Sequence, residues 1–167
     1  MINFKEIKNK IFTRENLYCL IIISITFFLD RYSKILVLQK ISENSYYVNN
    51  YLNLDLLWNT GIGFGLLSSN SSFLYDSITL VIALVIIFLI IIFLKSDKFE
   101  KITFSLIIGG AIGNFYDRVI FKAVPDFIDF HYHDLHWFTF NLADIFITFG
   151  ILIYLLKDVV RLKYEKN

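Results

Sequence analysis

The 167-residue chain contains one cysteine and one proline, so an internal disulfide and a proline-rich linker are both excluded. Charged residues make up only 19% of it, whereas 56% are hydrophobic and 18% aromatic. This balance excludes an ordinary soluble domain and predicts an integral membrane protein. Its basic residues form no patch suited to nucleic acid, and no phosphate-binding glycine loop or G-x-S-x-G motif occurs. Without repeats or a linker, residues 1–167 are expected to form a single membrane domain.

Four apolar segments are long enough to cross about 30 Å of hydrocarbon at about 1.5 Å per residue. They cover residues 17–38, 73–94, 101–121 and 137–157. The second carries no charge from Ile78 to Leu94 and is expected to face lipid, whereas polar residues in the others favour inward packing. The predicted fold is an α-helical integral membrane protein with four transmembrane helices.

The basic residues predict how these helices are oriented. Of the 16 Lys and Arg residues, 11 precede the first span, separate the second from the third, or follow the fourth. Both termini are therefore expected in the cytoplasm, with the first span as an uncleaved anchor. Two segments then face outward. Residues 39–72 contain alternating leucines that predict a strand, and residues 122–136 are expected to form an outer loop.

Three spans carry an aspartate at a similar depth. Counted from the expected outer helix ends, Asp30 lies about 12 Å inside, Asp117 about 6 Å and Asp144 about 10 Å. A charge at membrane depth is costly and is usually retained for function. The shared depth therefore predicts a polar site beneath the outer surface, facing the bundle interior. Gly109 and Gly113 form a small-xxx-small pair that favours close helix packing nearby.

Several of these charges are interpreted as a buried network that joins the helices. Asp30 and Lys34 are four residues apart and can pair on one helix face. Arg31 is expected to extend toward the membrane interface. Asp117 and Arg118 are adjacent in sequence and cannot face each other on a helix, so each is expected to find another partner.

Asp144 has no basic neighbour in its own span and needs a partner from elsewhere. The candidates are Asp126, Asp129 and Asp134 in the outer segment, or a histidine. Two carboxyl groups that share a site cannot both ionise easily, so one keeps its proton. Such a pair can activate a water for attack on a carbonyl. Residue counting does not choose between Asp126 and Asp129.

The segment "DFHYHDLH" also contains possible zinc ligands: His131, His133 and His136 with Asp129 and Asp134. It lacks the H-E-x-x-H motif of metalloproteases, and histidines two residues apart share a face only on a strand. These histidines are interpreted as interfacial residues in an aromatic belt, and no metal is expected. An ion-transport role would also use intramembrane charges, but the second span, which carries no charge from Ile78 to Leu94, does not favour it.

Five motifs in order carry a family resemblance: "DRYSK" (30–34), "NTGIGFG" (59–65), "GGAIGNFYDRV" (109–119), "VPDFIDF" (124–130) and "FNLADIF" (140–146). Together they resemble lipoprotein signal peptidase (signal peptidase II), a family of bacterial membrane aspartyl proteases. The resemblance implies that Asp126 and Asp144 are the catalytic pair and that Asp129 is a bystander. It also implies substrate contacts from Asn59, Gly61, Asn114, Arg118 and Asn141, with support from Asp30, Lys34 and Asp117.

The resemblance further implies a small extracytoplasmic β-sheet within residues 42–68, beside the substrate. The expected activity is removal of the signal peptide from diacylglyceryl-modified prolipoproteins, by a cut just before the lipidated cysteine. The enzyme is expected in the bacterial inner membrane, surrounded by membrane lipid, with its active site near the outer face. No metal, cofactor or nucleic acid is expected, and a monomer suffices.

Overall fold

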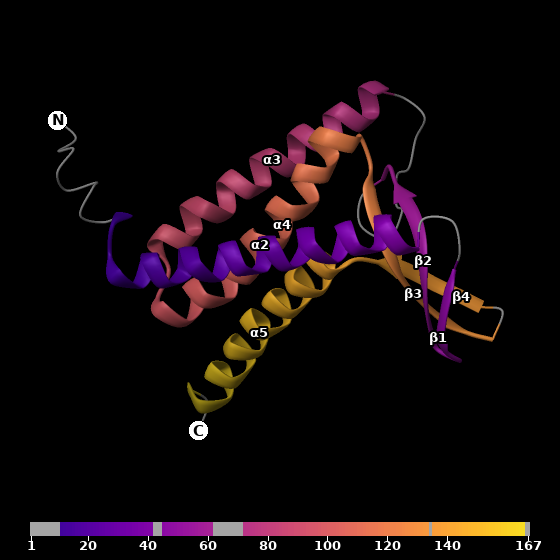
Figure 1. The fold of residues 1–167 in the computed structure, drawn as a ribbon. Coiled ribbons are helices and arrows are strands. Elements are labelled where there is room, and N and C mark those ends of the chain that lie inside the picture. The colour runs from indigo at the N-terminus through magenta and orange to yellow at the C-terminus, as the bar shows by residue number, and fades with distance from the viewer. Residues whose placement is uncertain (1–10, 42–44, 62–71, 134, 166–167) are drawn as a thin grey trace.

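A four-helix bundle carries a small β-sheet at one end (Figure 1). The computed structural model describes residues 11–41, 45–61, 72–133 and 135–165. The start of the first helix and the end of the last lie away from the sheet (Figure 1). The elements are α2 (Arg14–Lys40), β1 (Tyr46–Asn49), β2 (Leu52–Asn59), α3 (Ser72–Lys95), α4 (Lys98–Phe121), β3 (Val124–Tyr132), β4 (Leu135–Phe140) and α5 (Leu142–Glu165).

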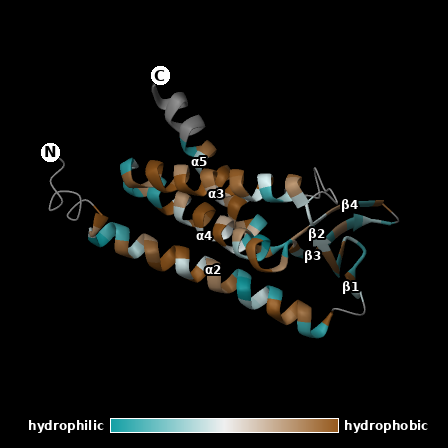
Figure 2. Cartoon of the chain, turned by 90° about the horizontal axis from the view of Figure 1, so that it is seen from above, coloured by the Kyte–Doolittle hydropathy of each residue, from teal (hydrophilic) through white to brown (hydrophobic). Residues whose placement is uncertain are grey.

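All four helices have 24 or 27 residues and are thus long enough to cross a bilayer. Within the described ranges, only α3 combines that length with a sufficiently apolar 18-residue stretch, whose mean hydropathy is 3.4. Its ribbon is coloured hydrophobic along most of its length in Figure 2. The other helices contain polar residues, several of them buried. The four-span arrangement therefore stays a prediction.

Helix α4 packs against α2, α3 and α5, and glycines allow the close approach. A Cβ atom on Gly113 would lie 2.5 Å from the Asp30 carboxylate of α2. One on Gly109 would lie 2.8 Å from Thr26 Cβ, also on α2. These separations are too short for any real Cβ contact, so the expected close packing at this glycine pair is confirmed. It brings the polar faces of α2 and α4 together beneath the sheet.

The sheet is antiparallel throughout, in the order β1-β2-β3-β4. The strand predicted from the alternating leucines is confirmed as β2. Part of the expected insert, residues 42–44 and 62–68, lies outside the described residues. The structure thus builds half of this sheet from the insert and half from the segment that follows α4.

The prediction of an outer loop over residues 122–136 was wrong, as was the start of the fourth span at residue 137. These residues form a hairpin of β3 and β4, and α5 begins at Leu142. The aromatic run before Leu142 is apolar enough to resemble the start of a span, yet aromatic residues also favour strands. Pro125 lies in β3, opposite Trp58 of β2, although proline cannot donate to the ladder.

Candidate active site

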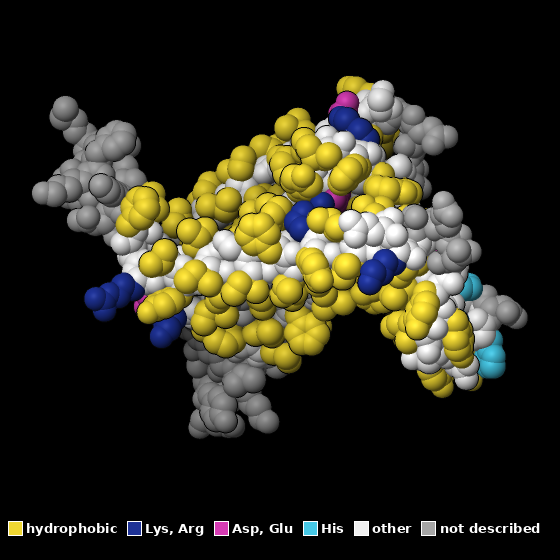
Figure 3. Space-filling model, viewed as in Figure 1, with side chains coloured by type: hydrophobic (Ala, Val, Ile, Leu, Met, Phe, Trp, Pro, Cys, Tyr) yellow, Lys and Arg dark blue, Asp and Glu magenta, His cyan; other side chains and the backbone are white. Residues whose placement is uncertain are grey.

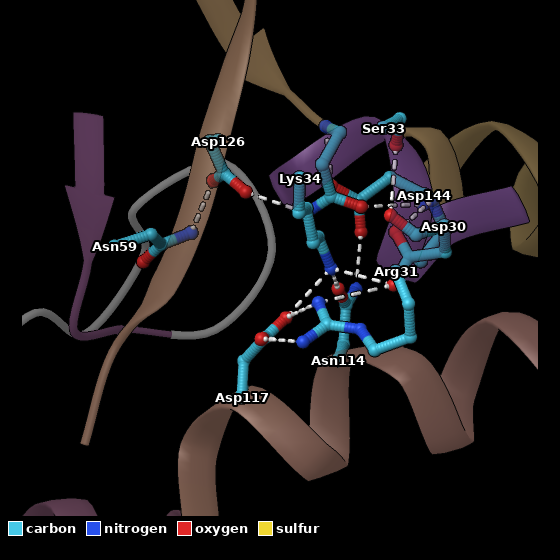
Figure 4. Close-up of polar contacts among 11 residues, drawn as sticks. Asp30, Arg31, Ser33, Lys34, Asn59, Asn114, Asp117, Asp126 and Asp144 are labelled. Atoms are coloured by element: carbon cyan, nitrogen blue, oxygen red, sulfur yellow. Dashed lines mark hydrogen bonds and ion pairs between the residues drawn. The ribbon is translucent and has the colours of Figure 1, made fainter. Parts of the chain in front are cut away.

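Lys34 of α2 is the centre of a buried polar network. Its ammonium donates to Asp30 at 2.9 Å, to Asp117 at 2.7 Å and to the Asn114 side-chain oxygen at 2.8 Å. Figure 4 shows Asn114 and Asp117 extending from α4 toward this ammonium group. Three acceptors satisfy its three N–H donors. The expected i,i+4 pair of Asp30 and Lys34 is confirmed.

Arg31 does not extend to the membrane interface, so that prediction was wrong. Its Nη1 lies 2.6 Å from Asp117 Oδ1, and its Nη2 donates to Asp117 Oδ2 at 2.8 Å. The guanidinium also lies over the Tyr116 ring, 4.9 Å from its centroid. Lys34 alone would neutralise only one of the two buried carboxylates, so a second cation is needed for the other. Together, Asp30 and Asp117 are balanced by Lys34 and Arg31.

The network extends to the start of α5. The Asn114 amide donates to Asp144 at 2.8 Å, and Asp30 accepts the Ala143 backbone N–H at 3.1 Å. The expected convergence of the three aspartates is therefore confirmed. Asp144 lies in the first turn of α5, not about 10 Å inside a span as residue counting predicted.

A capping box explains how Asp144 is held. Asn141 precedes the helix, and its side-chain oxygen accepts the Asp144 N–H at 3.1 Å. The Asp144 carboxylate accepts the Asn141 N–H at 3.2 Å in return. This reciprocal pattern satisfies two backbone donors at a helix start. The sequence "FNLAD" therefore fixes both the beginning of α5 and the direction of the Asp144 carboxylate.

Asp126 of β3 approaches the same asparagine from the sheet. Its carboxylate accepts the Asn141 side-chain amide at 2.6 Å and the Asn59 amide at 2.8 Å. The Asn59 oxygen accepts the Gly61 N–H at 2.8 Å, which orients the amide toward Asp126 (Figure 4). Asn141 consequently binds both acids, Asp126 with its side chain and Asp144 with its backbone.

Asp126 is only 1% exposed, and this changes its titration. Burial raises the pKa of the carboxyl from 3.8 to about 6, and the nearby Asp144 charge acts in the same direction. The Asn59 and Asn141 amides act in the opposite direction because they stabilise the charged form. An acid that titrates close to neutral pH is suited to proton transfer.

This raised pKa predicts how stability depends on pH. Folded Asp126 binds its proton more tightly than the unfolded chain, so the free energy of unfolding falls between about pH 4 and pH 6 and stays lower above. Asp126→Asn removes the effect and should stabilise the protein by about 1–3 kcal/mol near pH 7.5. Its advantage should vanish near pH 4.

Thermal unfolding at several pH values measures this difference, with exposed Asp55→Asn on β2 as the control. An Asp126→Asn advantage that stays constant with pH would contradict the assigned titration.

Arg118, a predicted substrate contact, and Asp129, the predicted bystander, form no hydrogen bond or ion pair with either acid among the described residues. Arg118 is 4% exposed, and its Nε and Nη1 have no hydrogen-bond partner within the described part of the chain. Asp129 pairs with His136 at 2.8 Å, and within the described ranges it does not pair with Asp144. Because Asp129 is three residues from Asp126 on one strand, its side chain points to the opposite face of the sheet. Asp134 lies outside the described residues.

Sequence reasoning missed an apolar cavity beside the acids, of about 300 Å³. It lies between β4 and the first turns of α5. The available signal was the pair Phe138 and Phe140, whose spacing of two residues is typical of one face of a strand. The segment was instead predicted to be part of a span. Its lining residues are Phe138, Phe140, Asp144, Ile145, Thr148 and Phe149.

Residues 22–160 match the family model for signal peptidase (SPase) II. The chain belongs to the signal peptidase II family. It is 46% identical over 154 residues to the lipoprotein signal peptidase of Pelagibacter ubique, covering 90% of this chain and 93% of the relative. The lipoprotein signal peptidase of Anaplasma phagocytophilum is 37% identical over 87% of this chain and 94% of its own.

Solved structures support the fold. One, described as "Bacterial membrane enzyme structure by the in meso method at 2.3 A resolution", matches with a TM-score of 0.69 and 31% identity. It covers 85% of this chain and 89% of the solved one. A second, at 1.9 Å, gives a TM-score of 0.68 and 28% identity over 84% and 91%. Membership of the signal peptidase II family makes the chain a peptidase.

Proposed function

We propose that the chain is an aspartyl endopeptidase that removes the signal peptide from diacylglyceryl-modified prolipoproteins, cutting just before the lipid-modified cysteine. The observation that carries the aspartyl mechanism is the double role of Asn141, which binds Asp126 and Asp144 at once. The names of the relatives support the substrate class. All these groups come from one chain, which supports a monomer as the active form.

The two acids act as one coupled unit that holds a single proton. The ionised carboxylate removes a proton from a water as its oxygen attacks the carbonyl carbon of the scissile peptide. The protonated carboxyl gives its proton to the carbonyl oxygen, which forms a neutral gem-diol. The C–N bond then breaks as the nitrogen takes a proton from the newly protonated acid and one gem-diol hydroxyl returns its proton to the other carboxylate. A carboxylic acid and an amine leave, and the pair again holds a single proton.

Neighbouring groups have supporting roles in this proposal. Asn114 and Asn141 orient the acids, and Lys34 fixes Asn114 in turn. Arg118 Nε and Nη1, which have no partner among the described residues, can bind a substrate carbonyl, since a buried donor without a partner is costly. Asn59 and the Gly61 region adjoin the acid pair from the sheet side. The apolar cavity at β4 and α5 can receive apolar parts of the substrate beside Asp144.

The proposed setting is the bacterial inner membrane, with both termini in the cytoplasm and the acids near the outer face. Contacts support one basic end: Lys157 pairs with Asp97 and Glu100 at the turn between α3 and α4, and Lys101 donates to Asn16 near the start of α2. This end lies opposite the sheet (Figure 1). Hydrophobic side chains cover most of the visible helix surface in Figure 3, as contact with lipid requires.

The substrate proposal is tested with two versions of one precursor, with and without the diacylglyceryl group. Purified enzyme reconstituted in lipid vesicles should cleave the lipidated precursor at least about 100-fold faster, because acyl chains anchored in lipid bring the scissile bond to the site. Mass spectrometry of the product should place the lipidated cysteine at its new N-terminus. Equal cleavage of both precursors, or a cut elsewhere, would contradict the proposed substrate.

A further inference from the structure

A second polar cluster lies on the β3–β4 hairpin and is not used by the proposed mechanism. It consists of Asp129, His131 and His136, each of which offers one ligand atom, all within 4.8 Å of one another. His136 Nδ1 lies 2.8 Å from Asp129 Oδ2, and His131 Nδ1 lies 3.4 Å from the same oxygen. The two imidazole rings stack with centroids 5.3 Å apart.

Strand geometry explains why these three side chains meet. Asp129 and His131 are two residues apart on β3 and therefore share a face. His136 of β4 is the cross-strand partner of His131, so its side chain lies on that face as well. Asp126 points to the other face. The cluster is thus separated from the acid pair by the sheet itself.

Buried polar atoms in this cluster lack partners. The side chains of Asp129 and His131 are only 6% and 7% exposed, yet His131 Nδ1 makes no hydrogen bond within the described ranges. Asn53 lies directly opposite Asp129 on β2, and its buried side-chain oxygen also has no partner there. Leaving such atoms unsatisfied typically costs about 1–3 kcal/mol each. A cation held by the cluster would remove this cost at His131 Nδ1.

We propose that Asp129, His131 and His136 bind a zinc ion, which makes this face of the hairpin a metal site distinct from the peptidase centre. Two imidazoles and one carboxylate are a typical zinc donor set, whereas calcium and magnesium prefer oxygen ligands throughout. Zinc bonds of about 2.0–2.2 Å in a tetrahedron place donor atoms about 3.3 Å apart. The separations of 2.8 and 3.4 Å from Asp129 Oδ2 lie on either side of that value, and all three donors lie within 4.8 Å of one another.

Access to the site is open. The His136 side chain is 60% exposed, so an ion can enter from solvent and keep a water in the remaining position. Histidine side chains are visible at the margin of the sheet in Figure 3. The ion would join β3 to β4 beside the register shift at Phe130 and His131. Its role is to hold together the hairpin that carries Asp126 on one strand and leads into α5 on the other.

Zinc titration by calorimetry tests the site in untagged, full-length protein that has been freed of metal with EDTA and then of the EDTA. Wild type should bind one zinc ion per chain, and zinc should raise its unfolding temperature. His136→Gln should weaken binding by at least about 10-fold, because even the loss of an outer partner of a metal ligand does so. The matched control is His133→Asn, an exposed histidine outside the cluster with a positive φ of 52° that asparagine tolerates.

The exposed position of His136 keeps the test valid even if variants of buried Asp129 fail to fold. Absence of zinc binding to wild type would overturn the proposal. So would equal affinity in wild type and His136→Gln, or a loss of affinity in His133→Asn alone. Cleavage of the precursor in EDTA is a separate measurement that bears only on the aspartyl mechanism.

Discussion

Replacing either Asp126 or Asp144 by asparagine is expected to lower the rate of precursor cleavage by at least about 1,000-fold. Each variant keeps a side chain of the same size but loses the ability to exchange a proton with the attacking water or the leaving nitrogen. Because the acids act as a unit, the double variant should be hardly less active than either single one. The measurement is the single-turnover rate with lipidated precursor at saturating enzyme.

Asp129→Asn is the matched control, since Asp129 lies on the same strand and was the rival partner for Asp144. Assayed in EDTA, it should cleave at close to the wild-type rate. Thermal unfolding and precursor binding should show that the Asp126 and Asp144 variants are folded. Substantial turnover in Asp126→Asn, with loss of turnover in Asp129→Asn, would transfer the catalytic role to Asp129.

Lys34→Met is expected to cost about 3–5 kcal/mol of folding stability, the largest such effect of a single substitution at this site. Methionine fits the space but leaves Asp30 and Asp117, both fully buried, with one cation in place of two. It also removes a hydrogen bond from the Asn114 oxygen, and Asn114 orients Asp144. Cleavage should therefore fall even in molecules that remain folded. Unfolding in denaturant measures the first effect.

Lys122→Met is the control for Lys34→Met. Lys122 pairs with Asp76, but both side chains are more than 60% exposed, so its loss should cost less than about 1 kcal/mol. Adding Asp117→Asn to Lys34→Met should recover part of the lost stability, because the two sites are coupled. If the costs in the double variant simply add, Lys34 is not the partner that neutralises Asp117.

Much of the bundle follows from the sequence because membrane burial leaves little freedom. Long apolar runs must be helical, and charges within them must meet one another. This is why the Asp30–Lys34 pair, the glycine contacts of α4 and the convergence of three aspartates could all be predicted. The prediction for Arg31 was wrong because the sequence does not show how many cations the buried carboxylates Asp30 and Asp117 need as partners.

The sheet was harder to predict because strand pairing depends on distant partners. The run from His136 to Phe140 is apolar enough for a span, and only pairing with β3 makes it a strand. The error moved the expected helix start by five residues, from 137 to Leu142. "FNLAD" contained the missing signal, since an asparagine three residues before an acid is typical of a helix start.

The capped start of α5 fixes the length of the connection between β4, which ends at Phe140, and α5, which begins at Leu142. Inserting a single residue between Phe140 and Leu142 would turn the helix by about 100° relative to the hairpin. Asp144 would then leave Asn114 and Asp126, although every side chain required for the chemistry would still be present. Insertions should therefore be tolerated in the turn between α3 and α4. An insertion between Phe140 and Leu142 should abolish activity.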